Sequence, residues 1–255
     1  MKLLCVGDSH SRLIGLKPEG ARFRYGHLSP TRIPAFDEAH ILSIKGATAA
    51  GFQPKDNMSS SFARATRAIR RLDPDVICFG FGQVDAEQSC YYMALRDGTS
   101  IEAALDAKTK VLTRYLRFCL RAAKGRHLVI KGLNTSTLHN TADLHRMLLR
   151  KIPRQLGLPR KRAARWLMAH GVDIEAHRHL NTAMADALRT ATEVAGLPYF
   201  DLRDLTALPD KSGLTRPALC GNAGDVHLAQ TPDIETAFGS ALARSVRMPE
   251  RLQPA

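Results

Sequence analysis

The chain has 255 residues, of which 44% are hydrophobic and 24% are charged, so it can fold around a core of its own without disulfides or bound metals. It contains no run of eighteen apolar residues, which excludes a membrane-spanning helix. The formal charge of +13 favours anionic partners, but the sequence has no zinc-finger spacing, RNP pattern or basic low-complexity tail, so specific nucleic-acid binding is not expected.

The predicted elements alternate between short apolar strands and longer helices. In chain order they are strands at Leu3–Val6 and Ala39–Ile44, a helix at Met58–Leu72, a strand at Val76–Phe81, a helix at Ile101–Ala123, a strand at Arg126–Gly132, a helix at Val172–Ala195, a strand at Tyr199–Leu202 and a helix at Thr231–Val246. Strands joined by helical crossovers pair in parallel. The sequence therefore predicts one α/β domain over residues 1–255, a three-layer α/β/α sandwich with a five-stranded, mostly parallel sheet.

One basic segment departs from this rhythm. From Leu144 to Val172 there is no acidic residue, whereas the basic residues are Arg146, Arg150, Lys151, Arg154, Arg160, Lys161, Arg162 and Arg165. We expect an insertion at about residues 140–172. It could be a solvated helical face, a lid, or a surface for an anionic glycan or lipid.

The cysteines and histidines give no sign of a metal or a disulfide framework. The cysteines are Cys5, Cys78, Cys90, Cys119 and Cys220, with no C-x-x-C pair, and the first two lie in apolar runs where we expect them to be buried. His177 and His179 would not share a helix face, so we expect two solvated polar residues there. No glycine-rich phosphate loop follows a predicted strand, and no cofactor is expected. The short apolar start is not a secretion signal, and we expect a cytoplasmic protein.

The segment Gly7-Asp8-Ser9 ends the first predicted strand. The carboxyl ends of parallel strands share one edge of a sheet, which is where ligands bind in such folds. A serine there becomes a nucleophile only beside a base. His10 is adjacent in sequence, but adjacent side chains diverge, so His227 near the C-terminus is the better candidate.

Four segments together resemble the conserved blocks of the SGNH/GDSL hydrolases. They are Gly7–Ser9, Lys45–Gly51, Phe81–Asp85 and Asp225–Leu228, in the order of the family and each after a predicted strand or near the C-terminus. More narrowly, the first and third blocks resemble a bacterial subgroup that reads Phe-Gly-Glu-Ile-Asp at the third. The resemblance implies a flavodoxin-like hydrolase fold, and it spans nearly the whole chain.

The resemblance also implies roles for individual residues. The catalytic residues would be Ser9, His227 and Asp225; the oxyanion hole would be formed by Ser9 and Gly46 with one side-chain amide, from Gln83 or Asn134; and Asp8 and Asp85 would support the site. No metal is implied.

Two positions depart from the family pattern. Val84 stands where the family has an oxyanion asparagine, so Gln83 or Asn134 would have to supply the side-chain amide. Gly224 stands where the family has its acid, three residues before the histidine, so Asp225 would take over that role; otherwise the base is a Ser–His dyad or the acid comes from elsewhere.

The predicted function is therefore a serine esterase that hydrolyses a small ester through an acyl-enzyme, with an O-acetyl group on a carbohydrate as a substrate suggested by the resemblance. The alternatives are an acyl- or acetyltransferase that acts on a glycan and a non-catalytic binding protein on the same scaffold. The expected partner is a small-molecule or glycan ester, which could be anionic. The sequence does not give the oligomeric state.

Overall fold

The computed structural model describes residues 1–16, 23–54, 57–209, 213–221 and 225–246. Gly224 lies outside these residues. The strands are β1 (Lys2–Gly7), β2 (Leu28–Thr31), β3 (Glu38–Ser43), β4 (Val76–Gly80), β5 (His127–Lys131) and β6 (Tyr199–Phe200). The α-helices are α1 (Ser61–Leu72), α2 (Cys90–Asp97), α3 (Ile101–Ala123), α4 (Thr141–Leu156), α5 (Arg160–Ala169), α6 (Ile174–Val194), α7 (Arg203–Thr206) and α8 (Pro232–Val246). Short 3-10 helices occur at Ser9–Leu13 (η1) and Pro217–Leu219 (η3), and a π-helix occurs at Asp85–Ser89 (η2).

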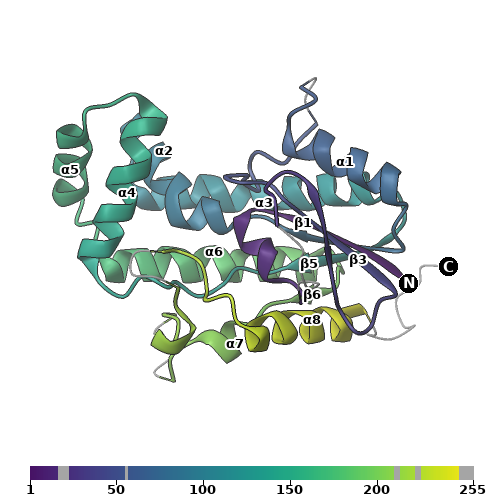
Figure 1. Cartoon of the computed structure of the whole chain (residues 1–255). Coiled ribbons are helices and arrows are strands. Elements are labelled where there is room, and N and C mark those ends of the chain that lie inside the picture. The colour runs from purple at the N-terminus through teal and green to yellow at the C-terminus, as the bar shows by residue number, and fades with distance from the viewer. Residues whose placement is uncertain (17–22, 55–56, 210–212, 222–224, 247–255) are drawn as a thin grey trace.

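The described strands form one sheet in the order β2-β3-β1-β4-β5-β6 (Figure 1). All neighbours pair in parallel except β2, which pairs antiparallel with β3 at the edge. The predicted parallel α/β architecture is confirmed, but the count of five strands is wrong because β2 was not predicted. Its sequence Leu-Ser-Pro-Thr has only one large apolar residue, so it shows no pattern typical of a strand. An edge strand tolerates the proline that it contains.

Both faces of the sheet are covered, which makes three layers. On one face, Leu4, Val6, Ile77 and Phe79 pack in the core that α1, α3 and α6 complete. On the other face, Leu3, Cys5, Val76 and Cys78 pack with residues of α8. Because both faces of the sheet are buried, the central strands are continuous apolar runs in the sequence. In such sheets ligands bind beyond the carboxyl ends of the strands.

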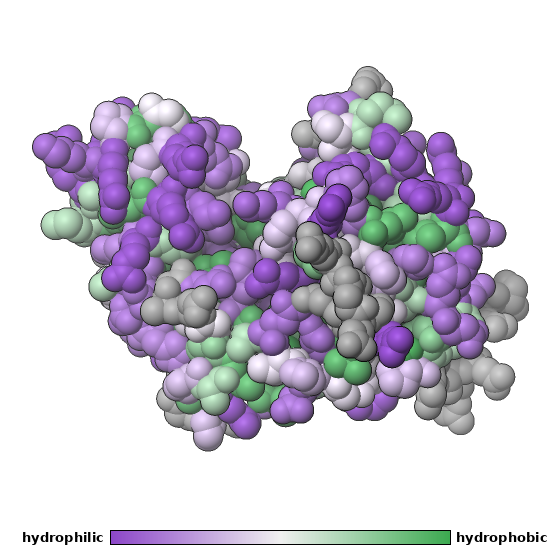
Figure 2. All heavy atoms as spheres, in the orientation of Figure 1, coloured by the Kyte–Doolittle hydropathy of each residue, from purple (hydrophilic) through white to green (hydrophobic). Residues whose placement is uncertain are grey.

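Helices α4 and α5 contain the basic segment and form an arm beside α2, on the side of the molecule away from α1 (Figure 1). Leu144, Leu148 and Ile152 bury one side of α4. Figure 2 shows a hollow between this arm and the part of the molecule that carries α1, with hydrophilic side chains gathered on the arm. The description of residues 140–172 as an insertion stays a prediction. No helix among the described residues has the length and apolar character needed to cross a membrane.

Candidate active site

Ser9 lies at the carboxyl end of β1, where the chain turns sharply. A Cβ atom on Gly7 would lie 1.8 Å from Ser11 Oγ and 2.4 Å from the carbonyl oxygen of Gly80, so only glycine allows this close approach. Asp8 then caps η1, its Oδ1 accepting a hydrogen bond from the N–H of His10 at 3.0 Å. The turn presents the side chain of Ser9 at the first position of the helix.

Ser9, His227 and Asp225 form a continuous hydrogen-bonded chain. Nε2 of His227 lies 2.8 Å from Ser9 Oγ, and Nδ1 of His227 lies 2.6 Å from Asp225 Oδ1. The same Oδ1 accepts the backbone N–H of His227 at 3.1 Å, and Thr137 Oγ1 donates to the carbonyl of Asp225 at 2.8 Å. The aspartate two residues before the histidine therefore reaches the imidazole directly. With a proton on Nδ1 facing the carboxylate, the lone pair of Nε2 faces the serine.

The environment of the hydrogen-bonded residues Ser9, His227 and Asp225 keeps the imidazole in the unprotonated state that a general base requires. Burial lowers the pKa of His227 below its ordinary 6.5, electrostatic repulsion from the neighbouring His10 imidazole when it is protonated lowers it further, and the hydrogen bond to Asp225 opposes both. For Asp225, partial burial raises the pKa, but the hydrogen bonds from His227 outweigh this and hold it below the ordinary value. Near pH 7 the imidazole is therefore neutral and the carboxylate is ionised.

Gly46 lies on the wall of the same pocket as Ser9, in the loop after β3. Its φ of +70° is the left-handed region, and this requirement explains the glycine because a Cβ atom would meet open space. The loop is held by Asp85, whose Oδ2 accepts from the N–H of Ala49 at 2.6 Å and whose Oδ1 pairs with Lys108 Nζ at 2.8 Å. Within the described residues, the N–H groups of Ser9 and Gly46 donate to no protein acceptor.

Gln83 and Asn134 are not among the residues that line the pocket. The side-chain amide of Gln83 donates to Glu87 Oε1 at 3.0 Å, and its oxygen accepts from the N–H of Asn134 at 2.7 Å. Oδ1 of Asn134 accepts from Lys131 Nζ at 3.3 Å, and Nδ2 lies 3.5 Å from His10 Nδ1. The structure therefore does not bring either amide to the pocket, whereas Val84 does line it.

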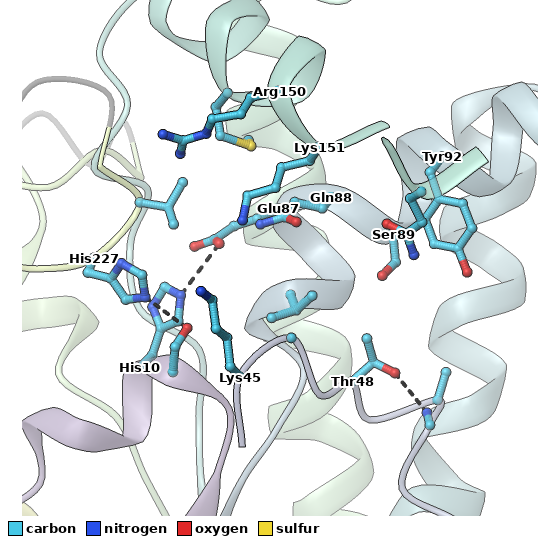
Figure 3. Close-up of a pocket in the computed structure, with 18 of the residues that line it drawn as sticks. His10, Lys45, Thr48, Glu87, Gln88, Ser89, Tyr92, Arg150, Lys151 and His227 are labelled. Atoms are coloured by element: carbon cyan, nitrogen blue, oxygen red, sulfur yellow. Dashed lines mark hydrogen bonds and ion pairs between the residues drawn. The ribbon is translucent and has the colours of Figure 1, made fainter. Parts of the chain in front are cut away.

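The structure adds two residues that sequence reasoning missed, His10 and Glu87. The His10 ring stacks on that of His227 with centroids 4.3 Å apart, and His10 Nε2 lies 3.5 Å from Glu87 Oε2 (Figure 3). Both side chains are buried, at 1% and 3% exposure. Burial lowers the pKa of His10 to about 4 and raises that of Glu87 to about 8, so both groups are uncharged near pH 7.

The signals for these two residues were weak. The divergence of adjacent side chains argues against His10 as the base of Ser9, but it does not prevent His10 from stacking on the imidazole that contacts Ser9. No motif points to Glu87, although it stands four residues after Gln83. That spacing places the two on one helix face, where they do form a hydrogen bond.

Elsewhere, the expectation that His177 is solvated is wrong. His177 is fully buried within α6, and its Nδ1 lies 3.0 Å from the hydroxyl of Tyr91. The sequence spacing gave no hint of this because the partner lies on α2. Among the residues that the structure describes, no three His, Cys, Asp or Glu side chains are grouped so as to hold a metal ion.

The site opens into a pocket of about 640 Å³ between the loop after β3 and α4. Figure 3 shows the two stacked imidazoles of His10 and His227 on one side of it, with Lys45 and Lys151 reaching toward them. The turns that follow β1, β3 and β4 all contribute to the wall, as expected for the carboxyl edge of a parallel sheet.

Similarity to known structures agrees with this architecture. No family model matches the sequence, and no curated protein matches it significantly. A structure described as a GDSL-like lipase from Parabacteroides merdae is 12% identical, with a TM-score of 0.53 over 96% of this chain and 94% of that one. An acylhydrolase structure from Bacteroides fragilis is 10% identical, with a TM-score of 0.52 over 96% of this chain and 86% of that one. The chain therefore has the fold of the SGNH/GDSL hydrolases.

Proposed function

We propose that this chain is a serine ester hydrolase that acts through an acyl-enzyme. The observation that carries the proposal is the unbroken chain Ser9–His227–Asp225 beside an open pocket. A serine 2.8 Å from a neutral imidazole that is itself oriented by a carboxylate is the arrangement that activates a nucleophile. This arrangement favours catalysis over a non-catalytic binding role, because a binding protein does not need a serine hydrogen-bonded to an oriented imidazole.

In the acylation step, Ser9 Oγ attacks the carbonyl carbon of the ester while Nε2 of His227 accepts the hydroxyl proton. The carbonyl oxygen becomes negative and faces the N–H groups of Ser9 and Gly46, which have no acceptor among the residues that the structure describes. When the tetrahedral intermediate collapses, the C–O bond to the alcohol breaks and the alcohol leaves with the proton from His227. The acyl group stays on Ser9.

In the deacylation step, water replaces the alcohol. His227 takes a proton from the water, the hydroxide attacks the acyl carbon, and the proton returns to Ser9 as the carboxylic acid leaves. Asp225 holds the imidazole in one tautomer and stabilises its transient positive charge in both steps. The net reaction consumes one ester and one water and yields one acid and one alcohol.

The proposed oxyanion hole has two backbone donors. The third donor of the family is replaced by Val84, and Gln83 and Asn134 are engaged with other groups. Because a single oxyanion donor is typically worth about 10²–10³ in rate, we expect a modest turnover unless the substrate itself supplies compensating contacts.

The substrate we propose is a small ester. The two similar structures are described as a lipase and an acylhydrolase, which agrees with ester chemistry, whereas an O-acetyl group on a carbohydrate is suggested by the sequence resemblance alone. Transfer of the acyl group to a sugar hydroxyl would use the same residues. Product analysis with and without a sugar acceptor separates the two reactions.

The experiment that tests the proposal is covalent labelling of the protein with a fluorophosphonate, together with hydrolysis of para-nitrophenyl acetate. The wild type should be labelled at Ser9 and should release para-nitrophenol, and Ser9→Ala should do neither. Ser89→Ala is the matched control, because Ser89 also lines the pocket but contacts neither His227 nor Asp225. Labelling that persists in Ser9→Ala, or a wild type that is inert in both assays, would overturn the proposal.

A further inference from the structure

Three positively charged side chains face the pocket without an acidic partner. They are Lys45, Arg150 and Lys151, and none of them forms an ion pair with any residue that the structure describes. Lys45 does lie over the ring of Tyr25, with its Nζ 5.9 Å from the centroid. Three positive charges therefore lie near one another here, and none of them is neutralised by an ion pair with a described residue.

These side chains come from two separate parts of the chain. Lys45 belongs to the loop after β3, and the other two belong to α4 (Figure 3). Met147, Lys151 and Gln155 follow each other at intervals of four residues and therefore share one face of α4, which lines the pocket. Met147 on this face is also one of the buried residues of that helix. The fold thus directs part of the basic segment at the proposed nucleophile instead of leaving all of it in solvent.

The acidic groups on the pocket wall do not cancel these charges. Asp225 is hydrogen-bonded to His227, and Glu87 is buried and carries a proton near pH 7. The fourth cation on the wall, Lys108, is already paired with Asp85. Partial burial lowers the pKa of Lys151, and the charges of Arg150, Lys45 and Arg154 lower it further, which means that these cations interact with one another.

We propose that Lys45, Arg150 and Lys151 form a binding site for a negatively charged group, a phosphate or a carboxylate, on the alcohol portion of the ester. This inference rests on the proposed hydrolase function and gives it a substrate class. The pocket, at about 640 Å³, holds much more than an acetyl group, so the remainder of the substrate reaches the cations while its ester lies at Ser9. An anion there relieves the repulsion among the three cations and gains charge-assisted hydrogen bonds.

The test compares three acetate esters with the same phenyl ring and measures released acetate. They are para-acetoxybenzamide, which is neutral, its near-isostere para-acetoxybenzoate, and para-acetoxyphenyl phosphate. For the wild type, kcat/KM should be about tenfold or more higher for a charged ester than for the neutral one, since a hydrogen bond to a charged group contributes that much. The carboxylate and phosphate arms show which anion the site prefers.

The variants Lys151→Met and Lys45→Met should each remove most of this preference, chiefly by raising KM for the charged esters, so that the ratio of kcat/KM for charged to neutral ester falls toward one. Two variants in different segments guard against loss of folding in one of them. Arg162→Met is the matched control, because Arg162 is an exposed cation of α5 that does not line the pocket. It should retain the full preference.

A second readout is independent of turnover. Phenyl phosphate should bind to Ser9→Ala in isothermal titration, with affinity that falls as salt rises and falls about tenfold when Lys151→Met is added. Equal kcat/KM for all three esters, or binding of phenyl phosphate that Lys151→Met leaves unchanged, would overturn the anion site while leaving the hydrolase proposal intact. If Ser9 is neither labelled nor active but phenyl phosphate still binds through Lys151, the hydrolase proposal fails and the anion site stands.

Discussion

Replacing Glu87 by glutamine should change how the stability of the protein depends on pH. The carboxyl group is 3% exposed, and burial raises its pKa from 4.5 to about 8. The folded protein therefore keeps a proton that the unfolded chain releases above about pH 4.5. The stability that this proton contributes is fully present below pH 4.5 and is lost as the pH rises to 8.

The magnitude follows from the two pKa values. Across the interval from 4.5 to about 8, the ionisation of Glu87 costs the folded state about 5 kcal/mol. Glu87→Gln removes the ionisation but keeps the shape and the acceptor for Gln83. Its free energy of unfolding relative to the wild type should therefore increase by about 5 kcal/mol between pH 4.5 and 8. His10 and His177, whose pKa values burial lowers to about 4, act in the opposite sense in both proteins, so the difference cancels them.

The assay is urea unfolding of both proteins at a series of pH values, followed by circular dichroism and by the fluorescence of Trp166, the only tryptophan. The control is Glu102→Gln, because Glu102 is exposed and its pKa is not raised. That variant should not show an increasing difference from the wild type over this interval. A difference between Glu87→Gln and the wild type that stays constant with pH would refute the assignment of a protonated, buried Glu87.

Three further predictions concern the proposed site. Asp225→Asn should lower kcat by about 10³–10⁴ with little change in KM, because the amide favours the wrong tautomer of His227; a loss below tenfold would indicate a Ser–His dyad. Gly46→Ala should destabilise the protein by about 1–2 kcal/mol in urea unfolding, since its φ of +70° strains any residue with a Cβ, and should also lower kcat if its N–H binds the oxyanion; unchanged stability would contradict the left-handed geometry. The kcat/KM of an uncharged ester should fall with acid only below pH 6.5, because burial lowers the pKa of His227 and the imidazole must be neutral to accept a proton; a midpoint above 6.5 would contradict this.

The central sheet was predictable because its strands leave a one-dimensional signal. Buried parallel strands such as Leu3–Val6 and Val76–Phe81 are continuous apolar runs, and each ends at a glycine or a polar turn. Strand β2 was not predictable, because its register comes from hydrogen bonds to β3 and not from its own residues. Helix α2 was hidden for a related reason. It continues from the π-helix η2, whose first residue, Asp85, also ends the third motif.

The residues of the candidate site also differ in how far the sequence predicts them. Ser9, His227 and Gly46 could be named from the sequence because each lies in a short motif next to a strand end or near the C-terminus. Asp225 could be named only as a substitute for the missing acid at Gly224, and the 2.6 Å contact to the imidazole is a fact of three-dimensional structure. The stacking of His10 on His227 and the contact of His10 with Glu87 bring together segments that are far apart in sequence. No local sequence pattern predicts such contacts.

We predict that the protonation of Glu87 affects the proposed anion site through Lys151. Glu87 faces His10 and His227 on one side, and the charge of Lys151 lowers its pKa from the other. While Glu87 is neutral, Lys151 stays free to bind an anion; above pH 8 the ionised carboxylate competes for it. The ratio of kcat/KM for para-acetoxybenzoate to that for para-acetoxybenzamide should therefore fall about threefold to tenfold in the wild type as the pH rises through 8.

The same measurement on Glu87→Gln separates this effect from other titrations. The variant has no carboxylate to ionise, so its ratio should stay constant from pH 7 to 9, and division by the neutral ester removes any change in the reactivity of His227 or Asp225. A ratio that falls equally in both proteins would mean that the cations themselves lose their protons. A ratio that stays constant in both would mean that Glu87 does not regulate Lys151. Either result would break the link between the buried carboxyl group and substrate charge, because that link requires the wild type alone to respond.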